Sequence, residues 1–333
     1  MALSLSILDQ SPIVAGATPS DAVGATLALA RRADELGYKR YWLAEHHALE
    51  GLGDASPEVL LARLTGETSR IRLGTGGIML PHYSAFKVAE NFRMLEALAP
   101  GRIDLGVGRA PGGSGLVSAA LESRDPELFP EQIADTLAYL AGTSPARSAF
   151  APLRAMPSGS TVPELWVLGS SEYGALLAAR MGLPYAFAHF IGGDAPEIPR
   201  AYRARFRASS TSAVPRVIVA FAALTAPSDE EAEALALPVA LWRMRLYRGI
   251  HGPIPSLEEA QRYAWTPLER HEIATTRRMA VGSPQTVRRR LERLAEQYDA
   301  DEAMVVTIAP DYASRLRSYE LLAQAFAMHG LAA

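Results

Sequence analysis

The sequence predicts an α/β protein built as a (β/α)8 TIM barrel, and three observations support this fold class. Strand-like and helix-like segments alternate along nearly all of the 333 residues. Eight segments have the pattern of strands and nearly all are followed by a helix, which implies parallel strands joined by right-handed crossovers. Segment 217–221, Val-Ile-Val-Ala-Phe, is apolar on both faces, as in a barrel wall covered by helices. An open doubly wound sheet is the alternative that this alternation leaves.

The expected elements follow one another along the chain. Strands are expected at 3–8, 40–45, 72–80, 102–108, 165–168, 185–189, 217–224 and 303–308. Helices are expected at 21–36, 57–68, 85–98, 133–140, 172–181, 286–297 and 312–328. Ser20 is the expected N-cap of the first helix and Gly37 lies just past its end. Since roughly 250 residues is typical of one such barrel, a single domain is expected over 1–333.

Two segments interrupt the alternation. Segment 142–163 is rich in Pro, Ser and Ala and is expected to be a long surface connection. Segment 228–282 is far longer than one crossover needs. It holds a helical piece at 229–248, the stretch Gly-Ile-His-Gly-Pro at 249–253, and a second polar helical piece. The fold is therefore expected to carry a late insertion at about 228–282, of the kind that forms lids or oligomer contacts.

The composition excludes several classes of function. The formal net charge is −3 and the 36 acidic residues are spread along the chain, so no basic surface for nucleic acid is expected. The chain has no cysteine, which excludes disulfides, thiolate nucleophiles and cysteine metal sites. No secretory signal is expected, and the longest apolar run, 217–226, is about half a membrane span. A soluble cytoplasmic protein without membrane contact is the expectation.

Two familiar motifs fail on inspection. Gly106 and Gly108 begin like a dinucleotide-binding fingerprint, but Pro111 occupies the position of its third glycine. His46 and His47 are adjacent at a strand end, where neighbouring side chains point to opposite faces and form a poor chelating pair. No metal site is therefore expected.

Three residues at strand ends form a candidate phosphate site. Active sites of these barrels lie at the C-terminal ends of the strands. Ser170 and Ser171 follow the fifth strand and open a helix, whose free N–H groups favour an anion. Arg109 follows the fourth strand and can add a permanent, bidentate positive charge. Taken alone, the serines are a helix cap and Arg109 a salt-bridged strand end; their combination favours phosphate.

Two other strand ends complete the candidate site. Gly76 and Gly77 are adjacent inside the third strand, a pattern typical of a bulge or of the close approach of a flat ligand. His46 ends the second strand and can exchange protons near neutral pH. Taken alone, Gly76 and Gly77 could form an ordinary bulge, and His46 could be a structural histidine. Together the four strand ends predict a flat, phosphorylated cofactor across the barrel mouth.

These residues lie in motifs that resemble the bacterial-luciferase-like flavin oxidoreductases. The resemblance runs over nearly the whole chain. Its motifs are Trp-Leu-Ala-Glu-His-His at 42–47, Gly-Thr-Gly-Gly-Ile-Met-Leu-Pro at 74–81, Gly-Arg-Ile-Asp-Leu-Gly-Val-Gly-Arg at 101–109, Leu-Trp-Val-Leu-Gly-Ser-Ser at 165–171 and Val-Gly-Ser-Pro-Gln-Thr-Val at 281–287.

The resemblance implies an FMN-dependent monooxygenase that oxygenates a small organic substrate. FMN would be bound reduced, supplied by a separate NAD(P)H-dependent flavin reductase, and used with molecular oxygen. His46 aligns with the active-site histidine of the family, and Gly76–Gly77 with a non-prolyl cis peptide beside the flavin ring. Arg109, Ser170 and Ser171 align with the phosphate site. Members of the family commonly form homodimers through barrel helices.

The resemblance leaves alternatives and shows one departure. A dehydrogenase that uses the deazaflavin F420 shares this barrel, as do flavin-binding proteins without turnover. Light-producing luciferases carry a glutamate where this chain has Gly169, which indicates a non-luminescent bacterial branch. The substrate is not predicted.

Overall fold

A closed barrel of eight parallel strands forms the centre of the computed structural model, which describes residues 3–145, 148–276 and 278–328. The strands are β1 (Ser4–Asp9), β2 (Arg40–Leu43), β3 (Arg72–Thr75), β5 (Ile103–Gly108), β6 (Glu164–Gly169), β7 (Tyr185–Phe187), β8 (Val217–Thr225) and β10 (Glu302–Val306). Each pairs in parallel with the next in this order, and β10 also pairs with β1. The predicted (β/α)8 barrel is therefore confirmed, and the open doubly wound sheet is excluded.

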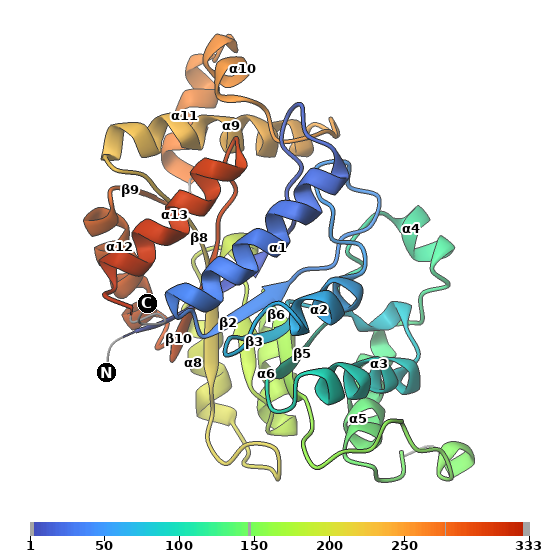
Figure 1. Cartoon of the computed structure of the whole chain (residues 1–333). Helices are drawn as coiled ribbons and strands as arrows, with labels where there is room; N and C mark the ends of the chain where they lie inside the picture. Colours follow the sequence, from blue (N-terminus) through green and yellow to red (C-terminus); the bar gives the residue numbers. More distant parts are fainter. Residues whose placement is uncertain (1–2, 146–147, 277, 329–333) are drawn as a thin grey trace.

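Helices surround the strands in Figure 1. They are α1 (Pro19–Leu36), α2 (Pro57–Thr65), α3 (Ala85–Leu98), α4 (Gly115–Ala120), α5 (Phe129–Leu140), α6 (Glu172–Met181), α7 (His189–Gly192), α8 (Glu197–Arg205), α12 (Pro284–Gln297) and α13 (Tyr312–Ala325). The N-cap of α1 is Thr18 rather than the predicted Ser20, because Thr18 and Asp21 form a reciprocal capping box. The predicted αL residue Gly37 does end the helix.

The strand predicted at 72–80 is broken into β3 and the short β4 (Ile78–Met79). The break falls at Gly76–Gly77, whose peptide bond is cis, as the family resemblance implies. A Cβ on Gly76 would lie 2.6 Å from Leu8 Cδ1, and one on Gly77 would lie 2.7 Å from the Gly106 carbonyl oxygen. At Gly77 the neighbour is backbone, so only glycine fits there, whereas at Gly76 the Leu8 side chain would have to move to admit a Cβ.

The lower end of the barrel, where the strands begin, is filled by charged groups. Arg40 Nη1 contacts Asp104 Oδ2 at 2.7 Å, and Arg40 Nε contacts Glu302 Oε1 at 3.1 Å. Trp42 Nε1 donates to Asp104 at 2.9 Å, and the Trp42 ring lies edge-on to that of Trp166. These groups satisfy one another away from water, so they contribute to the barrel and not to chemistry.

The insertion forms a separate group of helices above the barrel in Figure 1. It consists of α9 (Asp229–Tyr247), α10 (Leu257–Arg262) and α11 (Pro267–Thr276), and it returns through β9 (Ala280–Gly282), which pairs with β8. The predicted insertion at about 228–282 matches these bounds. Of the helices in the described part of the chain, none has the length and apolar character to cross a membrane.

Candidate active site

A cavity of about 330 Å³ lies between the C-terminal ends of the strands and helix α9 of the insertion. From the barrel it is lined by residues such as Ala222 of β8 and Val306 of β10, and from the loop after β2 by His46. From α9 it is lined by Trp242 and Arg243. The cavity therefore occupies the end of the barrel where this fold places its chemistry.

His46 is held in one orientation by a buried carboxylate. Its Nδ1 lies 3.0 Å from Asp54 Oδ2 and 3.1 Å from Asp54 Oδ1. Asp54 is fully buried, and that burial raises the pKa of its carboxyl group, while the hydrogen bond with His46 opposes the rise. A carboxylate at Nδ1 selects the tautomer that leaves Nε2 available as an acceptor. His46 thus lines the cavity with Nδ1 bound to Asp54 and with Nε2 free of hydrogen bonds to the described residues.

His47 belongs to a different, structural cluster. Its Nε2 lies 2.7 Å from Oε1 of the buried Glu45. The same carboxylate accepts from the Tyr83 hydroxyl at 2.8 Å and from the Met79 backbone N–H at 3.0 Å. The two histidines point apart, as expected, and among the described residues no group of three or more metal-binding side chains occurs.

The predicted phosphate residues gather at the start of α6. Ser171 is the N-cap of this helix, and its side chain makes no capping hydrogen bond. The Arg109 guanidinium lies over the ring of Tyr173, in the first turn of α6, at 4.1 Å from the ring centroid. Its ion pair with Glu127 is long at 3.5 Å, and its side chain is 37% exposed. Arg109 and the free N–H groups of the helix are thus available to an anion.

The structure places these residues in three locations. His46 lines the central cavity, whereas Arg109 and Ser171 lie at α6 and are not among the residues that line it. Gly76 and Gly77 lie inside the barrel against Leu8 and Gly106. The proposed roles of all six predicted residues stay predictions; what the geometry adds is their placement.

Sequence reasoning missed Asp54 and Arg243. Asp54 lies in the glycine-rich loop that follows His46, eight residues further along the chain. The sequence shows an acidic residue in this loop. It does not show that the loop folds back and brings Asp54 to the His46 ring. Arg243 lies in the insertion, where the sequence pattern indicates a helix and not which face lines a cavity.

Known proteins are similar to this chain in sequence over nearly its whole length. A family model described as luciferase-like monooxygenase matches residues 2–301. The chain belongs to the luciferase-like monooxygenase family. Relatives in this family include the uncharacterized protein YwcH of Bacillus subtilis (strain 168), which is 46% identical and aligned over 98% of this chain and 99% of its own. The N-acetyl-S-alkylcysteine monooxygenase of the same organism is 36% identical and aligned over 97% of this chain and 98% of its own.

Solved structures share this fold over nearly the whole chain. Apo-MsnO8 is 38% identical, with a TM-score of 0.91 over 98% of this chain and 99% of that one. Two more distant structures share the fold alone. The oxygenating constituent of 3,6-diketocamphane monooxygenase, solved with FMN, has a TM-score of 0.70 at 18% identity, covering 97% of both chains. An F420-dependent secondary alcohol dehydrogenase has a TM-score of 0.68 at 15% identity, covering 98% of this chain and 99% of that one.

Proposed function

We propose that this protein is an FMN-dependent monooxygenase that oxygenates a small organic substrate. The observation that carries the proposal is the position of His46. In a member of a monooxygenase family, a histidine oriented by the buried Asp54 lines an apolar cavity at the barrel mouth. Reduced FMN, when bound, supplies two electrons, so that one atom of O2 enters the substrate and the other leaves as water. A separate NAD(P)H-dependent reductase is the proposed source of the reduced flavin.

The residues present fit the phosphate of FMN. Arg109 offers a guanidinium that lacks a close carboxylate partner, and Ser171 offers a hydroxyl without a capping bond. Ser170 precedes it at the same helix start. Charge-assisted hydrogen bonds from these groups and from the α6 backbone suit a dianion.

His46 has the geometry of a proton donor or acceptor in this site. Asp54 holds Nδ1, so that Nε2 is the ring nitrogen left for the reacting groups. The walls contributed by Leu49, Leu52 and Phe190 are apolar and limit access of water to that nitrogen. Positioned proton transfer of this kind typically contributes about 10²- to 10⁴-fold in rate.

Mixing experiments with flavin test the proposal. The protein is loaded with reduced FMN without oxygen and mixed with oxygenated buffer while the flavin absorbance is followed. We expect a reoxidation time course that differs from that of free reduced FMN, and we expect His46→Ala to bind FMN equally but to change that time course. A time course identical to that of free flavin contradicts the proposal.

The same preparation tests the alternatives. The F420-dependent alcohol dehydrogenase with this fold makes F420 the other candidate cofactor. Binding of F420, and its reduction by a secondary alcohol, would favour a dehydrogenase over a monooxygenase. Equal affinity for oxidised and reduced FMN, without turnover, would favour a flavin-binding protein.

A further inference from the structure

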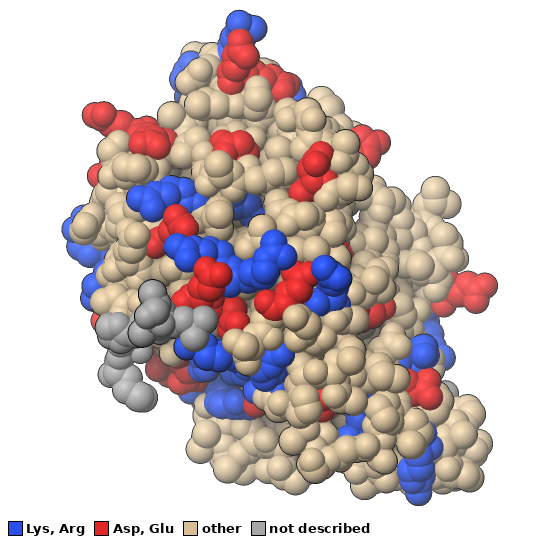
Figure 2. Space-filling view, viewed as in Figure 1, with Lys and Arg blue, Asp and Glu red and all other residues tan. Residues whose placement is uncertain are grey.

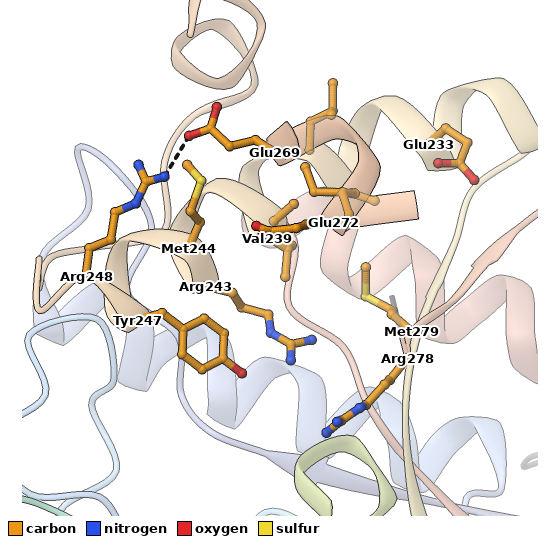
Figure 3. A pocket seen from close by; sticks show the side chains of 14 residues that line it. Glu233, Val239, Arg243, Met244, Tyr247, Arg248, Glu269, Glu272, Arg278 and Met279 are labelled. Carbon is orange, nitrogen blue, oxygen red and sulfur yellow. Dashed lines mark hydrogen bonds and ion pairs between the residues drawn. The ribbon is translucent and has the colours of Figure 1, made fainter. Parts of the chain in front are cut away.

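Arg243 is a cation shared by two adjoining cavities. It lies on α9 and lines the barrel-mouth cavity together with His46. It also lines a second cavity of about 500 Å³, formed mainly by α9 and α11. Val239, Tyr247 and Met279 line both cavities as well. Figure 3 shows the Arg243 guanidinium extending from α9 into this shared space.

The Arg243 guanidinium is distinguished from the other arginines by its combination of burial and isolation. Among the described residues it has no hydrogen-bond, ion-pair or aromatic partner, and it is half-buried. Other described arginines without a hydrogen bond or ion pair are all exposed: Arg124, Arg180, Arg205, Arg207, Arg270 and Arg293. An exposed guanidinium is fully hydrated, whereas the half-buried Arg243 is less hydrated and has no counter-ion among the described residues.

Many of the other described arginines are paired with carboxylates. Over α1 and its neighbours, Figure 2 shows Lys and Arg intermingled with Asp and Glu. Arg32, for example, contacts Glu35 at 2.8 Å and Glu320 at 2.9 Å. On α9 itself, Arg248 is bound to Glu269 at 2.8 Å, which Figure 3 draws as a dashed line. Within the part of the chain that the structure describes, the absence of a carboxylate partner at Arg243 is thus a local feature of the cavity.

The cavity walls favour an anion at Arg243. No Asp or Glu is among the residues that line the barrel-mouth cavity, where Leu246, Ile308 and Val306 are apolar neighbours. The second cavity is also lined by Glu233, Glu269 and Glu272, but each of these residues has a partner of its own; Glu269, for example, is held by Arg248 and by the Thr266 backbone N–H. A guanidinium in low-dielectric surroundings attracts a carboxylate more strongly than one in water.

We propose that Arg243 binds the carboxylate of the substrate, which is an organic acid with an apolar body. The apolar part would occupy the barrel mouth beside His46, and the carboxylate would contact the guanidinium at the junction of the two cavities. Arg278 also lines the second cavity, but it already donates to the Ile191 carbonyl at 2.6 Å. This inference rests on the proposed function, because it names the substrate class of that same site.

Calorimetric titration with a matched pair of probes tests the proposal. The probes are 4-phenylbutanoate and 4-phenylbutanamide, which differ in charge and not in shape. We expect the wild-type protein to bind the acid at least tenfold more tightly than the amide. Arg243→Met should abolish this preference without weakening the amide, and Arg243→Lys should retain part of it. Arg245→Met is the control, because Arg245 lies on the same helix but pairs with Glu259 at 2.7 Å.

Two results would overturn the proposal. The first is a wild-type protein that does not prefer the acid, including one that binds neither probe. The second is a preference that survives in Arg243→Met; if that variant does not fold, Arg243→Gln, which also removes the charge, provides the same comparison. A further titration with FMN and riboflavin excludes the flavin phosphate as the anion: Arg243→Met should weaken both flavins equally or not at all, and a selective loss of FMN contradicts the assignment.

The outcome is separable from that of the proposed function, because the titrations need neither reduced flavin nor oxygen. A protein that prefers the acid through Arg243 but fails the flavin-oxygen experiment would keep the subsite and lose the monooxygenase assignment. The reverse pair of results would keep the enzyme and lose the subsite.

Discussion

Replacement of Asp54 by asparagine is the sharpest perturbation of the candidate active site. The Asp54 carboxylate is fully buried, and both of its oxygens lie within 3.1 Å of His46 Nδ1. Asparagine keeps the size and one carbonyl acceptor but removes the negative charge. It also allows the amide NH2 to face the ring, which would leave Nδ1 as the acceptor and place the proton on Nε2.

The expected loss follows from that change of tautomer. Partners that orient a functional histidine are typically worth about 10- to 100-fold when removed. At about 1.4 kcal/mol for each factor of ten, the transition state is destabilised by about 1.4 to 2.7 kcal/mol. Because Asp54 touches His46 and not the start of α6, we expect the rate of the oxygen reaction to fall by this factor while FMN affinity stays within about twofold.

The assay is the time course of flavin reoxidation at saturating FMN, across pH 5 to 9. His46→Ala and the double variant provide a thermodynamic cycle. If Asp54 acts through His46, the double variant should be no slower than His46→Ala alone, and Asp54→Asn should shift the pH profile. Asp299→Asn is the control, because Asp299 is largely exposed and its positive φ tolerates asparagine. A double variant in which the two losses multiply, or an unchanged pH profile, would refute the positioning role.

Three further predictions concern the cofactor, stability and assembly. Arg109→Ala should weaken FMN about tenfold or more but leave riboflavin nearly unchanged, measured by fluorescence titration; equal losses would show that Arg109 does not contact phosphate. Burial acts to raise the pKa of Glu164, but the hydrogen bond and charge of Arg216, together with the charge of Arg40 and the hydrogen bond from Trp166, outweigh it and lower that pKa below 4.5. Glu164 therefore stabilises the fold above pH 4.5 and loses this contribution as the pH falls, so the urea midpoint of Glu164→Gln should depend less on acid pH than that of wild type. Met94 and Leu98 are exposed on one face of α3, so Leu98→Arg should convert the proposed homodimer to a monomer in light-scattering chromatography, and a monomeric wild type would contradict the dimer.

Much of the fold was predictable because residues close to the end of a helix or strand often determine where it stops. The bounds of α3 and α6 match the prediction at both ends, since Ala99 and Pro100-Gly101 follow the first and the αL residue Gly182 ends the second. Tyr185–Phe187 is shorter than the predicted strand 185–189, because His189 begins α7 after the chain leaves the sheet. That turn depends on packing against β8, which the local pattern does not contain.

The candidate site was only partly predictable for the same reason. His46 and Arg109 could be placed because they follow strands, and every strand of a parallel barrel ends on the same side. Asp54 and Arg243 acquire their meaning from tertiary contacts. Asp54 matters because a loop returns it to the His46 ring, and Arg243 because its face of α9 covers the cavity. Neither contact follows from periodicity.

The charged groups at the two ends of the barrel differ in how completely they are paired. At the lower end, Arg40 is surrounded by Asp104 and Glu302, and each partner is satisfied by another group of the protein. At the upper end, Arg109 has one long ion pair, at 3.5 Å, among the described residues, and Arg243 has none. A half-buried guanidinium without a counter-ion lowers stability, so a group such as Arg243 is retained where a ligand completes it. The two incompletely paired cations at this end of the barrel are the groups to which we assign the two proposed anions: the phosphate of the cofactor at Arg109 and the carboxylate of the substrate at Arg243.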